Sequence, residues 1–280
     1  MSFAEIIQVS SQPSQILGID FSGAKNAGTK IWIAIGYVAG DVLKIERCYP
    51  AKLLPESSKH RDQCLVALRH FIITQRACVC GLDFPFGLPR ELVKEDNWGE
   101  FILSFGNRYG NPDEFRETCH RDTHGRERRR VTDEERRTPF SPYNLRVYRQ
   151  TYFGIRDVLA PLVRDKSVCV LPMQNASPDK SWIVEVCPAS TLKTVDLYWH
   201  YKGNSKENIA ARAHILDKIE GTGELLVQTP QLQSRILDDR HGDALDSVVA
   251  AFATYRALRN LASSPAITPQ AYLLEGYVYV

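Results

Sequence analysis

Two short apolar segments that each end in an aspartate constrain the fold of this chain most. Residues 15–21 hold Asp20, which is followed by Phe21, a serine and two small residues, and residues 77–83 end in Asp83 just before a proline-rich turn. Short apolar segments bounded by glycine or proline are typical of buried strands. The pattern therefore predicts a sheet in which two strands carry a carboxylate at their carboxyl ends.

The segments between these two predict how the strands are ordered. Residues 30–38 and 42–49 are rich in β-branched and aromatic residues and are separated by an Ala-Gly-Asp turn, which predicts a meander. Residues 57–75 carry leucine, isoleucine and phenylalanine at helical spacing. A meander followed by a right-handed helical crossover places the first strand beside residues 77–83 and parallel to them.

Asp20 and Asp83 are therefore expected to lie close together. Neighbouring strands are about 4.8 Å apart, and open α/β sheets bind their ligands at the carboxyl ends of the strands. Two carboxylates at this distance repel one another and raise one another's pKa. A hard dication such as Mg²⁺ removes that conflict, because it prefers oxygen ligands.

The last predicted helix adds a second pair of acids. Residues 241–261 have one apolar helical face, and Asp243 and Asp246 lie three residues apart in its first turn, on the same side. The helix dipole favours carboxylates at this end. The alternative is that these aspartates only cap the helix, as is common. The preceding Asp238 and Asp239 are interpreted as loop or cap residues.

Residues 90–165 differ from the rest and predict a helical insertion. Within residues 116–149 there are ten arginines and six acids. Arginine binds phosphate in a bidentate manner, and the nearby Tyr143, Tyr148 and Tyr152 would stack on bases. The alternative is a solvated helix face on which arginines pair with the interleaved acids. The candidate substrate-binding residues are Lys25, Arg126, Arg129, Arg130 and His241.

Glu185 interrupts an apolar segment at residues 181–187 that predicts another strand. Buried glutamates are rare unless they are paired. Two interpretations remain open from the sequence. Either Glu185 faces the acidic site, or it pairs with an arginine of the insertion.

Four motifs occur in the chain in a fixed order. They are Gly-Ile-Asp-Phe-Ser-Gly-Ala at residues 18–24, Gly-Leu-Asp-Phe-Pro-Phe-Gly-Leu-Pro at 81–89, Glu-Val-Cys-Pro-Ala at 185–189 and Asp-Ala-Leu-Asp at 243–246. Together they resemble a family of predicted nucleases, domain of unknown function 429, within the ribonuclease H-like superfamily. The resemblance implies a mixed five-stranded sheet in the order 3-2-1-4-5, flanked by helices, with the helical insertion between strands 4 and 5.

The resemblance also implies roles for single residues. Asp20 corresponds to the first-strand metal ligand, Asp83 to the fourth-strand position, and Asp243 and Asp246 to the acids of the final helix. Glu185 matches a Glu-x-x-Pro block whose role is less clear, and it joins the catalytic candidates. Several related nucleases carry glutamate where this chain has Asp83, which shortens the reach of that ligand.

These residues predict a Mg²⁺- or Mn²⁺-dependent nuclease acting on DNA or RNA. Two ions would clamp the attacking water and the leaving oxygen, and Asp20 would bridge them. One alternative is an actin-like phosphotransferase or ATPase, which needs a second such domain and a second phosphate-binding loop that this sequence does not show. Another is an inactive module that binds nucleic acid or protein, because a fold alone does not fix a function.

Composition limits the size and the partners of the protein. The 280 residues, 44% hydrophobic and 24% charged, predict one core with an insertion, and hence a single domain over residues 1–280. The net charge is +2. A nucleic-acid site would therefore be a local basic patch rather than a field of the whole molecule.

The cysteines indicate a reducing environment. There are seven, an odd number, and the amino-terminus lacks a secretion signal, so we expect a cytoplasmic protein. No apolar segment approaches the length that crosses a bilayer. Cys119 with His120 and His124, and Cys78 with Cys80, lack the paired spacing of zinc sites, so we predict no zinc.

Overall fold

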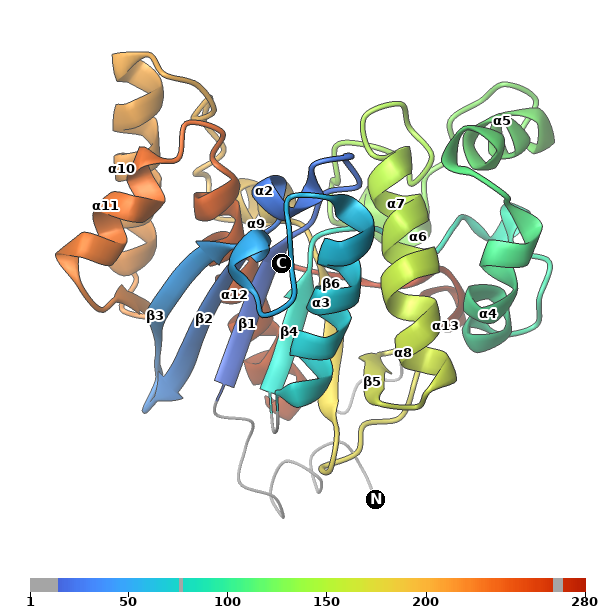
Figure 1. The fold of residues 1–280 in the computed structure, drawn as a ribbon, viewed down its shortest axis with the longest axis horizontal. Helices are drawn as coiled ribbons and strands as arrows, with labels where there is room; N and C mark the ends of the chain where they lie inside the picture. The colour runs from blue at the N-terminus through green and yellow to red at the C-terminus, as the bar shows by residue number, and fades with distance from the viewer. Residues whose placement is uncertain (1–14, 76–77, 264–268) are drawn as a thin grey trace.

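The structure is a computed structural model that describes residues 15–75, 78–263 and 269–280. Residues 1–14, on which the expectation about a secretion signal rests, lie outside these ranges. Helices cover both faces of one mixed, mostly parallel sheet (Figure 1). The strands in the described residues are β1 (Gln15–Asp20), β2 (Trp32–Ala39), β3 (Val42–Pro50), β4 (Cys78–Leu82), β5 (Val168–Leu171), β6 (Ser181–Val186), β7 (Leu225–Val227) and β8 (Val278–Tyr279).

The helices fall into two layers and several short turns. They are α2 (Ala27–Lys30), η1 (Ala51–Leu53), α3 (Arg61–Thr74), η2 (Arg90–Leu92), α4 (Trp98–Arg108), α5 (Pro112–Asp122), α6 (Val131–Glu135), α7 (Tyr148–Gly154), the π-helical η3 (Ile155–Leu159), α8 (Ala160–Arg164), α9 (Pro188–Thr194), α10 (Lys206–Glu220), α11 (Pro230–Asp238), α12 (Asp243–Ser263) and α13 (Gln270–Glu275). Among the described residues, no helix is long and apolar enough to cross a membrane.

The strands pair largely as the sequence predicts around β1. This strand is antiparallel to β2 and parallel to β4, with Ile19 opposite Leu82. The backbone N–H of Asp83 donates to the carbonyl oxygen of Ile19 at 3.0 Å, which carries the ladder to the end of both strands. The predicted parallel pairing of the two aspartate-bearing strands is confirmed.

The sheet is larger than the five strands predicted. In the part of the chain that the structure describes, eight strands form one sheet: seven follow the order β5-β6-β4-β1-β2-β3-β7, and β8 pairs with β6. The additional edge strands β7 and β8 have three and two residues. Segments this short carry no recognisable alternation, so the sequence did not reveal them.

The pleat of β1 determines which way Asp20 points. Leu17 and Ile19 belong to the hydrophobic core under α3, whereas Ile16 belongs to the core under α12. Because successive side chains of a strand point to opposite faces, Asp20 follows Ile16 to the α12 face. There it sits at the carboxyl end of a central strand.

The pleat of β4 repeats this arrangement. Cys80 and Leu82 lie in the core under α3, and Val79 lies in the core under α12. Asp83 continues the alternation and faces α12 as well. The two aspartates therefore point to the same helix, which is the last long helix of the chain.

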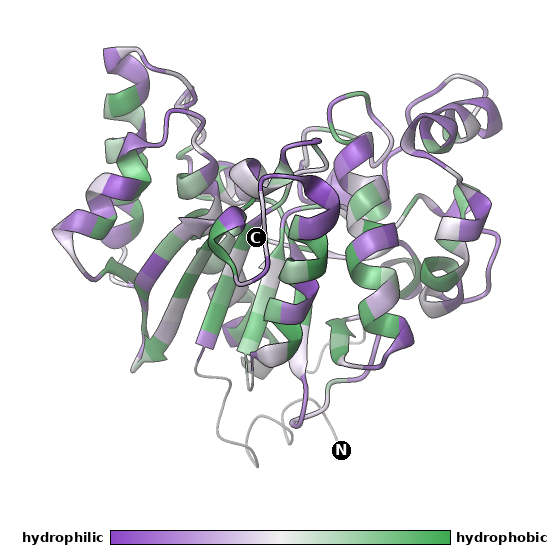
Figure 2. Cartoon of the chain, viewed as in Figure 1, coloured by the Kyte–Doolittle hydropathy of each residue, from purple (hydrophilic) through white to green (hydrophobic). Residues whose placement is uncertain are grey.

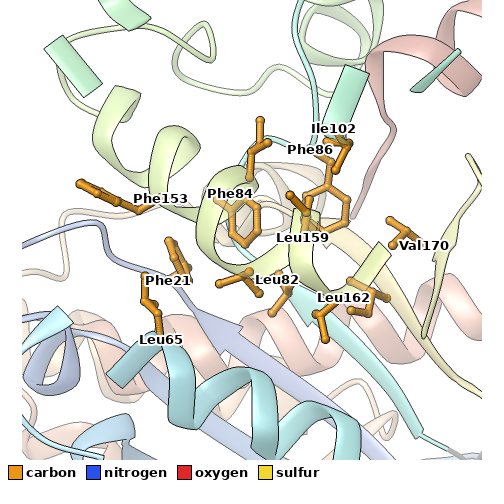
Figure 3. Packing of buried hydrophobic residues seen from close by; sticks show 14 of the residues in the cluster. Phe21, Leu65, Leu82, Phe84, Phe86, Ile102, Phe153, Leu159, Leu162 and Val170 are labelled. Atoms are coloured by element: carbon orange, nitrogen blue, oxygen red, sulfur yellow. The ribbon is translucent and has the colours of Figure 1, made fainter. Parts of the chain in front are cut away.

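Aromatic and aliphatic side chains fix the opposite face of these strand ends. Phe21 and Phe84 follow the two aspartates and point into the core under α3, where they pack with Leu65, Leu82 and Phe153 (Figure 3). Apolar residues dominate the central strands, and polar residues cover the outer sides of the helices (Figure 2). Burying such apolar surface is the main stabilising contribution to folding.

Between η2 and α8 the described chain forms helices and loops, with β5 beginning at Val168. Two predicted helices have other bounds. The sequence also predicts helices over residues 143–163 and 189–200; in the structure the first begins at Tyr148 and the second ends at Thr194. Asp196 has a φ of 54°, and a left-handed residue just past the last turn ends a helix.

Candidate functional site

Two glycines let α12 lie directly against the sheet. A Cβ atom on Gly18 would lie 2.1 Å from the backbone nitrogen of Ala251, and one on Gly81 would lie 1.9 Å from Oγ1 of Thr254. Only hydrogen fits at these contacts. Each glycine stands two residues before an aspartate, on the same face of its strand. The Gly-x-Asp motif thus packs the helix and aims the carboxylate beside its first turn.

We call Asp20, Asp83, Asp243 and Asp246 the acid cluster. The first, second and fourth of these line one cleft of about 310 Å³. Asp20 and Asp246 are buried. The carboxyl groups of Asp20 and Asp83 are close enough to hydrogen-bond to one another. The structure therefore brings acids from β1, β4 and α12 together, as the sequence predicts.

Burial makes this arrangement unfavourable for the charged acids. It raises the pKa of Asp20 well above its usual range, and the charge of Asp246 adds to the effect. Burial likewise raises the pKa of Asp83 to about 8 and that of Asp243 to about 6. An added positive charge would stabilise the ionised forms.

Asp243 and Asp246 are not the cap of α12. Asp239 has that role: its Oδ2 accepts the backbone N–H of Ala244 at 3.0 Å, and its Oδ1 accepts that of His241 at 3.3 Å. The interpretation of Asp239 as a cap residue is confirmed. The capping alternative for the two later aspartates is accordingly not supported.

Two cluster partners were missed in the sequence. The hydroxyl of Tyr201 donates to Oδ1 of Asp246 at 2.5 Å, and Nζ of Lys202 donates to Oδ2 at 2.6 Å. Both residues were assigned no role, because the segment that holds them has neither helical nor strand periodicity. Its one signal is the succession Tyr-Trp-His-Tyr-Lys at residues 198–202.

Glu185 belongs to a buried ion pair. The pleat of β6 turns it to the face opposite α12, where Nη2 of Arg130 lies 2.5 Å from its Oε1. The backbone N–H of Phe86 donates to Oε2 at 2.9 Å. The structure thus shows the pairing with an arginine of the insertion, and Glu185 also lines the cleft that holds Asp20, Asp83 and Asp246. Both interpretations left open therefore agree with the structure, and the catalytic role of Glu185 stays a prediction.

Arg130 has no donor left for a substrate. Its side chain is 1% exposed, and its N–H groups bond to both carboxylates of Asp133 and Glu185 and to the carbonyl oxygen of Glu275. Its predicted role in phosphate binding is therefore wrong. The buried guanidinium instead joins the insertion to β6 and to the end of α13.

The other arginines of the insertion lie in mixed-charge surroundings. Arg128 forms an ion pair with Glu91 at 3.3 Å, and Arg129 donates to the carbonyl oxygen of Pro139 at 3.1 Å. Arg128 and Arg129 line a groove together with Glu127 and Glu134, apart from the acid-cluster cleft. Arg126 is exposed. This agrees with the alternative of a solvated face with paired charges.

The three tyrosines proposed to stack on bases do not do so. Tyr143, Tyr148 and Tyr152 are buried. Their rings pack in the core under the insertion, which removes them as a stacking surface. Phe140 and Tyr198 line the acid-cluster cleft in their place, together with Arg146.

A basic pocket adjoins the acid cluster. It is lined by Lys30, Lys202, Arg240 and His241, with Asp243 at its edge. Nζ of Lys30 lies 3.8 Å from Oδ2 of Asp243. Of the predicted substrate-binding residues, His241 thus lies beside the acids. Lys25 is exposed.

The acid cluster has the chemistry of a site for Mg²⁺ or Mn²⁺, because its donors are carboxylate oxygens. Within the described ranges, however, no group of three or more His, Cys, Asp or Glu side chains is arranged to hold a metal ion. The carboxylate of Asp246 is already occupied by partners within the chain. One of its oxygens accepts a hydrogen bond from Tyr201 and the other accepts one from Lys202.

The sequence model of one protein family matches residues 18–270 of the chain, and that family carries the description "Protein of unknown function (DUF429)". No curated protein matches the chain. No solved structure matches it either.

Proposed function

The chain belongs to the DUF429 family of proteins of unknown function, and from the geometry of its own site we propose that it is a Mg²⁺- or Mn²⁺-dependent nuclease that hydrolyses phosphodiester bonds in DNA or RNA. One observation carries the proposal: Asp20, Asp83 and Asp246 come from three separate segments and line the same cleft. Burial of these acids is costly without a cation.

Each acid would have a distinct part in this site. Asp20 interacts electrostatically with each of the other three acids of the cluster, since Asp246, Asp243 and Asp83 all raise its pKa. It is therefore the best candidate for the shared ligand. Asp83 and Asp246 would complete the site from β4 and α12, with Asp243 on the side of the basic pocket. Ions held there supply charge neutralisation at a phosphate and an activated water.

The surroundings of the acids support an anionic substrate. Lys30, Arg240 and His241 line the basic pocket beside the cluster, and Arg146 lines the cleft itself. Positive side chains that border an acidic site suit a phosphodiester, since they hold the backbone phosphates that the acids would repel. The aromatic rings of Phe140 and Tyr198 offer surfaces on which a base would stack.

We also propose that the fold is ribonuclease H-like and forms a single domain over residues 1–280. The antiparallel meander β1-β2-β3 followed by parallel β4 supports this, as do helices on both faces. A cytoplasmic location fits the cysteines, all seven of which are free. Reduced thiols are typical of that compartment.

A second candidate is an inactive module that binds nucleic acid or protein. The ion pair of Lys202 with Asp246 favours it, because the chain then neutralises part of its own acid cluster. The two candidates differ in one measurable property, which is the binding of a divalent cation.

Calorimetric titration with Mn²⁺ tests the nuclease proposal. Native protein is expected to bind, and Asp20→Asn is expected to lose at least tenfold in affinity. Asp179→Asn, an exposed aspartate of a loop, is the matched control and should bind like the native protein. Cleavage of labelled single-stranded, duplex and branched substrates is then compared among the same three proteins. Absence of Mn²⁺ binding in the native protein would leave the inactive module.

A further inference from the structure

The acid cluster contains a cation supplied by the chain itself. Nζ of Lys202 lies 2.6 Å from Oδ2 of Asp246, whose side chain is only 4% exposed. Asp20 and Asp243 also act on the charge of this ammonium group and stabilise it. Lys202 thus holds a position among three carboxylates, where a cation is favoured.

The backbone around Lys202 is held firmly. The buried Arg212 donates through Nη1 to the carbonyl oxygens of Tyr201 at 2.7 Å and of Gly203 at 2.9 Å. The N–H of Gly203 donates to the carbonyl oxygen of Arg240 at 2.8 Å. A buried arginine is costly unless its donors are satisfied. These contacts fix the point from which the lysine side chain reaches the acids.

The side chain of Lys202 is less constrained than its backbone. It is 53% exposed, and its Nζ is held by a hydrogen bond to Oδ2 of Asp246. Lys202 lines both the acid-cluster cleft and the basic pocket. Rotation about its flexible four-carbon stem would carry the ammonium from one to the other without movement of the backbone.

Charge balance makes exchange with a dication favourable. The four aspartates of the acid cluster, once ionised, carry four negative charges against the two ammonium groups of Lys202 and Lys30. The acids then outnumber the cations, so a divalent ion is attracted even with the lysines in place. A metal bound at Oδ2 of Asp246 would leave no room there for Nζ.

We propose that the ammonium group of Lys202 and a divalent cation are alternative occupants of the acid cluster. Lys202 keeps the acids together when no metal is bound. When a metal arrives, the lysine turns into the basic pocket, where it would meet a substrate phosphate beside Lys30 and Arg240. The inference rests on the proposed metal site, and it adds a residue that regulates the loading of that site.

The test compares Mn²⁺ affinity by calorimetry in metal-free protein at neutral pH. Lys202→Met removes the competing charge and is expected to bind Mn²⁺ at least tenfold more tightly than the native chain. Lys202→Arg keeps a cation and should remain within threefold of native affinity. Lys206→Met changes an exposed lysine at the start of α10 and should behave as native. Lys202→Gln replaces the methionine variant should that protein not fold.

A second readout is the midpoint of thermal unfolding, measured first without metal and then with it. The midpoint of thermal unfolding in chelator should fall for Lys202→Met, since the acids lose their counter-ion, and saturating Mn²⁺ should raise it by more than in the native protein. Equal or weaker Mn²⁺ binding by Lys202→Met, with the native protein binding, overturns the exchange but leaves the metal site. Failure of both proteins to bind overturns the proposed function as well.

Discussion

The rings of Phe21 and Phe84 pack with their centroids 4.7 Å apart and their planes at 51°. Each ring directly follows an aspartate of the acid cluster. Because neighbouring residues of a strand point to opposite faces, this aromatic pair holds β1 and β4 in register on one face while the two carboxylates face each other on the other. The spacing of the acids is therefore set by the hydrophobic core.

Replacing Gly18 by alanine should destabilise the protein. The new Cβ would lie 2.1 Å from a backbone atom of α12, and the helix must move to admit it. Overpacking of this kind costs about 1–3 kcal/mol, or more where backbone must shift. Urea unfolding followed by circular dichroism measures the loss. Gly99→Ala, where the nearest atom lies at 3.4 Å, is the control and should not destabilise. An unchanged midpoint for Gly18→Ala would show that the helix is not closely packed there.

Arg130→Met should lower the free energy of unfolding by more than the same substitution at an exposed arginine. It leaves Glu185 and Asp133 buried without their partner, and breaking a buried ion pair from one side costs about 3–5 kcal/mol. Denaturant unfolding again measures the change. Arg126→Met, at an exposed position, should stay within about 0.5 kcal/mol of native. Similar losses for the two variants would argue against the structural role of Arg130.

The stability of the metal-free protein should fall as the pH rises. Asp83 has a pKa raised to about 8 in the fold, against about 3.9 when unfolded. A raised pKa means that the folded state holds the proton more tightly, so the contribution is complete below the unfolded pKa and is lost as the pH passes about 8. Asp20 acts in the same direction.

Unfolding free energies measured in chelator from about pH 5 to about pH 9 test this linkage. Asp83→Asn should flatten the profile, and Asp179→Asn should not. A native profile that rises over this range would contradict the predicted sign.

Mn²⁺ affinity should rise with pH over the same range. A metal binds the ionised carboxylates, so it competes with the protons that Asp83 and Asp20 retain. Calorimetry in two buffers of different ionisation enthalpy would detect proton release on binding. Binding without proton release would mean that the metal, where it binds, uses other groups.

The sequence predicts the acids well because each lies in a local pattern. Asp20 and Asp83 end apolar strands, and Asp243 and Asp246 share one turn of a helix. Their convergence then follows from strand order and pleat alone. The parts that were missed depend on contacts between distant segments. Lys202 reaches Asp246 across 44 residues, and no periodicity marks either the lysine or its loop.

The same distinction explains the arginine-rich insertion. Ten arginines in a short stretch suggest phosphate binding by composition, yet the fold buries Arg130 and pairs Arg128 with Glu91. Composition cannot distinguish a buried guanidinium from an exposed one, because the partner Glu185 lies 55 residues further along the chain. Glu185 itself was recognised as unusual, and only the structure supplies its partner.

The contact of Gly18 with α12 has a consequence for biosynthesis. The first strand of the sheet and the helix that covers it are separated by most of the chain, so a ribosome must complete nearly all of the protein before the two can meet. Until then the apolar face of β1 and β4 that α12 covers stays exposed, and the acid cluster lacks the two aspartates that α12 supplies. Contacts between segments this far apart in sequence favour slow folding, and we expect nascent chains to depend on chaperones until α12 emerges.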